Sequence, residues 1–447
     1  MKVSNGFYGI RWYFAFPVDA KAWISAAGWG AVIGISYFLS SRLGLSLLVP
    51  PLELAVFWPA SGIAVGILIT LGRRALPALA IGVMAGTVAS NLLSDRVLAT
   101  AIFKGLCNLS EPIIVAWLLK RWFGPEFSFG DLRRLLGFLT AAAVATAISA
   151  IGGAATVTLF QTKAPYWDVW RVWFLSDGIG IVLIAPLIIE FSRALRKLPS
   201  RRETIEGAVV LTLLALISTF VFSHTTQSWI SFDPDAFALP LLLWLAARWP
   251  PTFAITGAFL VSVAATATTL FGIGHLSDVG LSIIERVHGV QTTVMMVTVF
   301  TLVLVSLFAE RRQSEETLKQ SKNRLQLALD GAELGAFSAN LIASRLECDA
   351  RTALLHGHNV PPATITELRR FVHSDDLMQV EAAMVEACRR GGTWNAEYRV
   401  LHPFGHVYAG ETRWLAVEAS IVRDSQGHRP RYYGPQTRRG TSAHPKC

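Results

Sequence analysis

Apolar residues gather into about ten long stretches between residues 22 and 309, and this pattern stops at Glu310. A helix needs about 20 mostly apolar residues to cross a bilayer. The segment 236–248 is too short to cross alone, so eight or ten crossings are expected. The predicted spans are roughly 22–41, 53–71, 75–93, 97–119, 135–160, 169–190, 205–223, 236–248, 251–271 and 290–309.

The pattern changes twice after the last span. Residues 310–329 contain no Pro or Gly and are rich in good helix formers, which predicts a charged connector helix. Leu318 and Leu325 lie seven residues apart and Leu329 follows, as in a short heptad seam. This seam favours a homodimer through the connector, and a solvated spacer helix is the alternative. From residue 323 to 434, helical and alternating strand patterns predict one small α+β domain.

Composition agrees with a membrane protein, because 52% of residues are hydrophobic and only 16% are charged, against about 25% charged in soluble domains. The net charge of +9 does not indicate nucleic-acid binding, since the basic residues lie in loops between apolar segments. The four cysteines show no metal-ligand spacing, so neither a disulfide nor a metal site is expected. Residues 1–21 lack a signal-peptide pattern and are predicted to be a cytoplasmic segment.

Loop charges predict the orientation. One set of loops carries fourteen Lys and Arg residues and the opposite set carries five. Cytoplasmic loops collect Lys and Arg, so the first set is predicted to be inside, together with both termini. The first set is Arg73, Arg74, Lys120, Arg121, Arg133, Arg134, Arg193, Arg196, Lys197, Arg201, Arg202, Arg248, Arg311 and Arg312; the second is Arg42, Arg96, Lys163, Arg171 and Arg286.

Several polar residues fall within the predicted spans, where they are costly. Lys104, Asn108 and Glu111 follow an i, i+4, i+7 spacing, which places them on one face of the fourth span. Asn108 could bridge the other two, or each could pair with a neighbouring helix. Three further spans add Ser61, Asn91 and Asp177. We expect either a shared polar site inside the bundle or contacts that only hold helices together.

The segments that carry these residues resemble MASE1, a bacterial membrane-associated sensor domain. FWPASGIAVGILITLGRRALPALAIGVMAG, CNLSEPIIVAWLLKRW and WFLSDGIGIVLIAPLI are similar to the family's segments in order and spacing, over about residues 25–310. Ala60 and Ser176 depart from the residues usual there. The resemblance implies a multi-pass protein of the bacterial inner membrane, acting as the sensory input of a histidine kinase or a cyclic-dinucleotide enzyme. It implies no particular ligand.

Residues 323–434 resemble a PAS domain. The similar pieces are LALDGAELGAF, VHSDD at 372–376, EYRV at 397–400, RWL at 413–415, DSQG at 424–427 and YYG at 432–434. The resemblance implies structural roles, in which the aspartates cap the helix that follows them. No flavin or haem signature is evident, so no cofactor is expected and the ligand of the domain is unknown. The residues carried over are His373, Asp375, Asp376, Glu397, Arg399, Arg413 and Trp414.

An output domain is not recognisable in the sequence. No kinase or cyclase motif follows, no catalytic residue can be assigned, and residues 435–447 are unlike the usual continuation of a PAS domain. We therefore expect a truncation or frameshift near residue 434, or a separate kinase or cyclase protein as partner. The sequence thus predicts a membrane sensor. The alternatives are the N-terminal part of a histidine kinase or diguanylate cyclase, and a membrane transporter.

Overall fold

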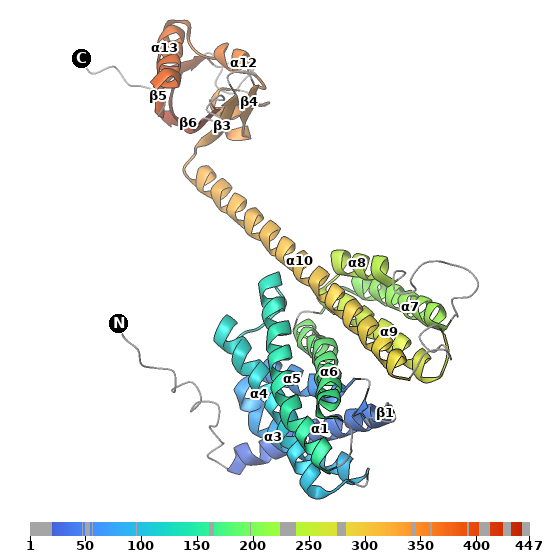
Figure 1. The fold of residues 1–447 in the computed structure, drawn as a ribbon. Coiled ribbons are helices and arrows are strands. Elements are labelled where there is room, and N and C mark those ends of the chain that lie inside the picture. Colours follow the sequence, from blue (N-terminus) through green and yellow to red (C-terminus); the bar gives the residue numbers. More distant parts are fainter. Residues whose placement is uncertain are drawn as a thin grey trace. The chain divides into compact units, whose positions relative to one another are not determined.

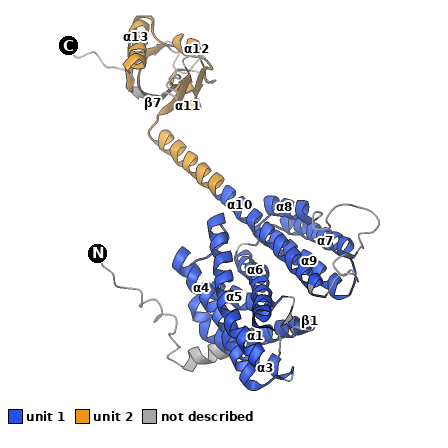
Figure 2. Cartoon of the chain, viewed as in Figure 1, with its two compact units in different colours: residues 1–313 blue, residues 314–447 orange. Residues whose placement is uncertain are grey.

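The computed structural model describes residues 20–46, 48–49, 54–55, 57–94, 96–160, 165–196, 198–223, 238–274, 283–340, 345–357, 360–390, 393–401, 412–422 and 431–439. The chain forms two compact units, Met1–Gln313 and Ser314–Cys447 (Figure 2). The first unit is helical and the second is mixed α and β (Figure 1). The predicted fold class, a polytopic helical membrane bundle with an α+β domain, is confirmed.

Helices occupy each of the segments predicted to cross the membrane. In chain order they are α1 (Ala20–Ser46), α2 (Pro59–Leu71), η1 (Gly72–Ala75), α3 (Leu76–Leu92), α4 (Leu98–Phe123), α5 (Leu132–Phe160), α6 (Tyr166–Ala194), α7 (Arg201–Ser223), α8 (Ala238–Arg248), α9 (Pro251–Leu270) and α10 (Ile283–Gly331). A short hairpin pairs β1 (Leu48–Val49) with β2 (Leu54–Ala55) between α1 and α2.

Within the described part of the chain, seven helical segments are long and apolar enough to cross a membrane. One of them, Pro59–Leu92, contains both α2 and α3 with the η1 turn between them. Helix α8 has eleven residues, which extend about 16 Å at 1.5 Å per residue. It is therefore too short to cross alone, as its sequence predicted.

The helices pack in a connected bundle. Helix α1 lies along α3, α2 lies against α6 and α4, and α5 contacts both α4 and α6. Helices α7 and α8 pack on α9, which in turn contacts α6. One cluster of buried side chains joins most of these helices, and it includes Val115, Phe138, Ile181, Leu242 and Val297.

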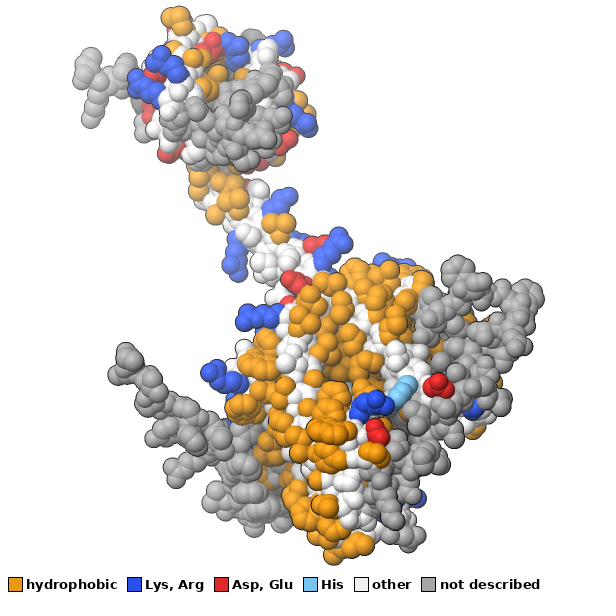
Figure 3. Space-filling model, in the orientation of Figure 1, with side chains coloured by type: hydrophobic (Ala, Val, Ile, Leu, Met, Phe, Trp, Pro, Cys, Tyr) orange, Lys and Arg blue, Asp and Glu red, His pale blue; other side chains and the backbone are white. Residues whose placement is uncertain are grey.

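The outer surface of the bundle is also apolar. On α7, for example, Ile205, Leu213, Leu216 and Phe220 are exposed, and apolar side chains make up much of the described surface of the unit that Figure 3 shows. Water-soluble helices keep a polar face, whereas a helix that is apolar all round belongs in a larger core or in lipid. The exposed apolar surface therefore fits contact with the bilayer.

The second unit contains a five-stranded antiparallel sheet in the order β4-β3-β7-β6-β5. Its core is built from Trp394, Tyr398, Val400, Leu415 and Val417, which alternate along two neighbouring strands. The strands are β3 (Gly335–Asn340), β4 (Arg345–Cys348), β5 (Thr393–Leu401), β6 (Thr412–Val422) and β7 (Arg431–Arg439), and the helices are α11 (Ala350–Leu355), α12 (Ile365–Arg369) and α13 (Ser374–Arg390).

Strand β7 extends beyond the domain boundary drawn from the sequence at residue 434. Gln436 pairs with Gly335 of β3 and with Val417 of β6, and Arg439 pairs with Trp414. Five residues of the predicted tail, 435–439, are therefore part of the central strand. Pro435 and the two arginines hide the alternating pattern that would have revealed this strand from the sequence.

Candidate intramembrane polar site

Glu111 and Asp177 form the centre of the candidate site. Both side chains are buried, Glu111 on α4 and Asp177 on α6. The Glu111 carboxyl group lies within interaction range of Asp177, of Ser61 on α2 and of Ser149 on α5. Four helices thus converge on one carboxyl group, and the spacing on α4 that suggested a polar face leads to a real cluster.

Helix α4 contains a proline at this point. Pro112 follows Glu111 inside the helix. Proline has no N–H group, so the carbonyl of Asn108, four residues earlier, loses its usual helical donor. The sequence therefore adds a backbone acceptor beside the carboxyl groups, where water or another polar group can satisfy it.

A second group of polar side chains adjoins the carboxyl pair. Asn91 donates to the Thr87 carbonyl at 2.9 Å, and Asn108 donates to the Thr87 hydroxyl at 3.4 Å. Tyr37 of α1 lies within interaction range of Thr87 and of Trp58. Thr87 therefore connects the two asparagines that were predicted from the sequence to a tyrosine that was not.

Lys104 lies near a tryptophan ring of α6. Its ammonium group stands 6.0 Å from the centre of the Trp173 ring, and Trp173 in turn lies within interaction range of Asp177. Asn108 contacts Thr87 on α3, which is a pairing between neighbouring helices, one of the two arrangements considered for α4. All six predicted residues fall in or beside one connected cluster.

Many buried polar atoms of this cluster lack a hydrogen bond of normal geometry within the described residues. Buried polar groups are normally hydrogen-bonded, and exceptions often mark a water, an ion or a functional role. Such atoms also occur elsewhere in the described part of the bundle, for example Ser41 Oγ, Ser218 Oγ and Ser306 Oγ. Those that belong to this cluster are Tyr37 Oη, Trp58 Nε1, Ser61 Oγ, Asn108 Oδ1, Glu111 Oε1 and Oε2, Trp173 Nε1 and Asp177 Oδ2.

Glycines allow close packing around the site. A Cβ atom on Gly180 would stand 2.7 Å from the carbonyl carbon of Trp58, and one on Gly44 would stand 2.6 Å from the Trp58 ring. A Cβ atom on Gly153 would likewise meet the Trp173 ring at 2.6 Å. Both tryptophan rings are thus packed directly on glycines.

Sequence reasoning missed Tyr37, Thr87, Ser149 and Trp173. Two of them had a usable signal, because Thr87 and Trp173 each lie four residues before a predicted polar residue, on the same helical face. Ser149 lies in a run of small residues and Tyr37 in an ordinary apolar span. Only the helix packing identifies these two.

In the second unit, Asp376 and Arg399 form the main polar contact. The Arg399 side chain donates to Asp376 Oδ1 at 2.6 Å and to Oδ2 at 2.9 Å, and its backbone N–H donates to Oδ2 at 2.8 Å. These contacts hold the pKa of the Asp376 carboxyl group below its usual value. Asp375 adds a longer contact, at 3.4 Å, to the same guanidinium group.

Asp375 and Asp376 lie in the first turn of α13, where the positive end of the helix favours their charge. The carboxylate of Asp376 is directed to Arg399 on β5, while the ring Nδ1 of His373 accepts from the Asp375 N–H at 3.3 Å. The backbone N–H of His373 donates to the Arg399 carbonyl at 2.8 Å. The capping role of the aspartates stays a prediction, and Asp376 also makes a tertiary contact that was not visible in the local pattern.

The remaining predicted residues surround this ion pair or line the sheet. The Arg399 guanidinium carbon stands 5.6 Å from the centre of the half-buried Trp414 ring, as in a cation–π contact. Arg413 is buried and Glu397 is exposed, on neighbouring strands. Together the residues join α13, β5 and β6 and serve the fold of this unit.

Comparison with known proteins gives one curated relative of matching organisation. The "Probable diguanylate cyclase DgcE" of Escherichia coli is 21% identical over 411 residues, which cover 88% of this chain and 34% of that protein. The chain therefore spans about one third of the length of the curated relative.

Two solved structures are also similar. A sensory box histidine kinase/response regulator from Burkholderia thailandensis is 26% identical, with a TM-score of 0.22, and covers 26% of this chain and 83% of that one. The N-terminal domain of a diguanylate cyclase with PAS/PAC sensor from Marinobacter aquaeolei is 20% identical, with a TM-score of 0.21, and covers 24% of this chain and 94% of that one.

The family models match both units of the chain. The MASE1 model matches residues 29–313, and a PAS fold model matches residues 345–434. The first match covers well over half of the chain and contains all the helices that form the polar cluster. The chain therefore belongs to the MASE1 family, and it is a multi-pass membrane sensory module in which a PAS domain follows the MASE1 domain.

Proposed function

We propose that this chain is the input part of a signalling protein, in which the membrane bundle detects a stimulus and the PAS domain passes it to an output. The output is a diguanylate cyclase, either within a longer protein or as a separate partner. The similarity to a curated diguanylate cyclase across both domains supports a cyclase over a kinase.

The proposed relay rests on one observation, the continuity of α10. This helix runs for 49 residues, from Ile283 to Gly331. Val294 and Val297, near its start, are buried in the bundle, and its end lies four residues before β3 begins at Gly335. A single helix that begins in the bundle and ends four residues before the first strand of the PAS sheet supports a relay between the two domains.

The polar cluster is the proposed point of detection. Two carboxyl groups in contact repel each other when both are charged, so such a pair holds a proton or a cation between them. Loss or gain of this occupant changes the attraction between α4 and α6. Because α2 is packed tightly on α6 at Gly62 and Gly180, a shift of either helix is passed to its neighbours.

A chimera tests this function. The matching third of the Escherichia coli diguanylate cyclase is replaced by this chain, and cyclic di-GMP formation is measured in isolated membranes at matched abundance. We expect cyclase activity that responds when Glu111→Gln or Asp177→Asn is introduced. The matched control is Asp168→Asn, which removes a carboxylate from an exposed position on the same helix as Asp177.

Three results would contradict the proposal. An inactive chimera that is well folded and abundant would oppose the cyclase output. Equal activity of the wild type and both carboxyl variants would remove the role of the polar cluster. Substrate uptake by vesicles that contain this chain, together with an unresponsive chimera, would favour a transporter instead.

A further inference from the structure

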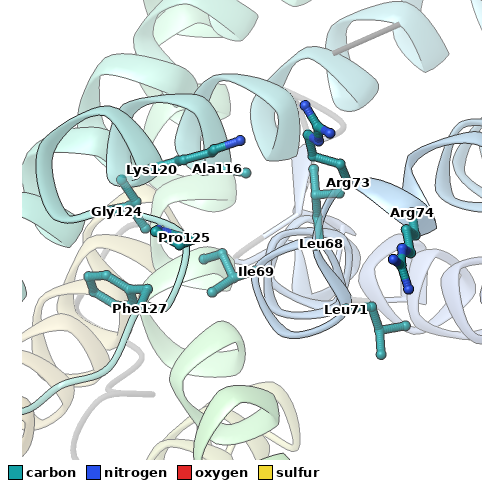
Figure 4. A pocket seen from close by; sticks show the side chains of 12 residues that line it. Leu68, Ile69, Leu71, Arg73, Arg74, Ala116, Lys120, Gly124, Pro125 and Phe127 are labelled. Carbon is teal, nitrogen blue, oxygen red and sulfur yellow. The ribbon is translucent and has the colours of Figure 1, made fainter. Parts of the chain in front are cut away.

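A cavity of about 390 Å³ lies where the end of α2, the η1 turn and the end of α4 meet. Arg73 and Arg74 contribute from the turn and Lys120 from the last turn of α4. In Figure 4 the Lys120 side chain extends toward the space beside Arg73, and Arg74 lies past Leu68. Among the described residues that line the cavity, three are cationic and none is acidic.

Two glycines shape this cavity. Gly72 ends α2 with φ +70° and ψ −165°, and Gly124 ends α4 with φ +87° and ψ −170°. Residues other than glycine avoid this region of backbone space. Each glycine N–H bonds to the carbonyl four residues earlier, and a Cβ atom on either would meet nothing within 4 Å. The two helices therefore end in the same way, beside open space.

The other walls of the cavity are apolar. Leu68, Ile69, Leu119 and Phe127 line it on the side of the bundle core, and Phe127 is buried. A cavity with cationic residues on one side and apolar residues on the other suits an anion that has an uncharged part. Its volume lies within the range of about 300–1,000 Å³ that is usual for small-molecule sites.

We infer that this cavity binds a phosphate-bearing anion. Guanidinium groups pair with phosphate oxygens through two parallel hydrogen bonds, and a lysine adds a point charge. Basic pockets between transmembrane helices bind anionic lipid head groups. The phosphate therefore comes from a membrane phospholipid, whose glycerol lies against the apolar wall, or from a soluble phosphate. This inference is independent of the proposed role of Glu111 and Asp177.

A matched pair of variants separates this site from general surface charge, because loops at one end of a membrane protein are basic for reasons of topology alone. Arg73→Gln with Lys120→Gln removes two charges from the cavity. Arg121→Gln with Arg133→Gln removes two charges from exposed positions near the same end, outside the cavity lining. Gel filtration and circular dichroism establish that both variants fold.

The full chain, purified in a nonionic detergent, is titrated with dihexanoyl phosphatidylglycerol, dihexanoyl phosphatidylcholine and inorganic phosphate, and binding is followed by thermophoresis. We expect saturable binding of phosphatidylglycerol or of inorganic phosphate, with phosphatidylcholine weaker. The cavity variant should bind at least about tenfold more weakly, and the control variant should bind like the wild type.

The pattern of results identifies the source or rejects the site. Preference for phosphatidylglycerol supports a lipid ligand, and equal or tighter binding of inorganic phosphate supports a soluble one. Equal losses in the cavity and control variants would show that the interaction is general surface attraction. That result, or absence of saturable binding to the folded wild type, would overturn the inference.

Discussion

Gly62 on α2 and Gly180 on α6 lie directly against each other, with no space for a side chain on either. A Cβ atom on Gly62 would stand 2.9 Å from the carbonyl carbon of Gly180. The contact lies next to the polar cluster, since Ser61 adjoins Gly62 on α2. Close approach of backbones through small residues is how helices associate in lipid, where apolar side chains gain little from leaving the bilayer.

Gly180→Ala is therefore expected to lower the stability of the bundle by about 1–3 kcal/mol, the range for inserting atoms into a filled core. Thermal unfolding in detergent and abundance in membranes measure this effect. Gly178→Ala is the control on the same helix, because the nearest atom to its new Cβ would be 3.9 Å away. Equal stability of the two variants would contradict the described contact.

Glu111→Ala and Glu111→Gln separate a structural from a functional role of this carboxyl group. Alanine leaves a void and removes the polar group that lies within interaction range of Ser61 and Asp177, so we expect a loss of about 2–4 kcal/mol. Glutamine keeps the volume and removes the charge, so we expect normal abundance with altered output in the cyclase chimera. Normal abundance and normal output of both variants would exclude a shared site at this position.

Asp376→Asn is expected to weaken the PAS domain locally, by about 1–2 kcal/mol, because it removes charge-assisted hydrogen bonds that are partly exposed. Hydrogen exchange of the α13 and β5 amides in the full chain should become about 5–30-fold faster. Arg389→Gln, which breaks an exposed ion pair with Glu386 on the same helix, should change exchange little. Unchanged exchange in Asp376→Asn would show that the ion pair contributes nothing measurable to the stability of the domain.

The same ion pair predicts a dependence on pH. The pKa of Asp376 is lower in the folded state. The ion pair therefore contributes fully to the free energy of unfolding above the pKa of the unfolded state, which is about 4. This contribution is lost as the pH falls through the folded value. The difference in protection between the wild type and Asp376→Asn should therefore be full near neutral pH and should shrink below about pH 4. A difference that grows on acidification would contradict the assignment.

The exposed leucines of α10 bear on oligomerisation. Leu318 and Leu325 are exposed in the single chain, as expected if a second copy covers them. With the native cysteines replaced by serine, Leu325→Cys should crosslink in membranes. Asn323→Cys should crosslink much less, since Asn323 lies about 140° around the helix from Leu318. Equal crosslinking at both positions would argue against a dimer seam.

Much of the fold could be predicted because bilayer crossing and sheet alternation leave strong periodic signals. The apolar stretches located the helices, and the alternation around Tyr398 and Leu415 located two neighbouring strands, β5 and β6. The extent of β7 could not be predicted, because Pro435 and Arg438 obscure an alternating pattern. Backbone pairing with two neighbours establishes that part of the strand, and such pairing is a tertiary property.

The candidate site was only partly predictable. Charged and amide side chains within apolar spans are conspicuous, so Glu111, Asn108 and Asp177 stand out in the sequence. The sequence does not say which helices are neighbours, and therefore could not identify Tyr37 or Ser149. The contact of Asp376 with Arg399 was missed for the same reason, since Arg399 lies on a different element.

The length of α10 limits how any signal can leave the membrane. Its residues 283–331 form one helix with no interior proline. In such a helix axial position and rotational phase are linked, because each residue adds 1.5 Å along the axis and about 100° around it. If the last span shifts by one residue in its packing against the bundle, α10 would therefore move 1.5 Å along its axis and turn by about 100° about it. The ratio of translation to rotation in such a shift is set by the geometry of the backbone.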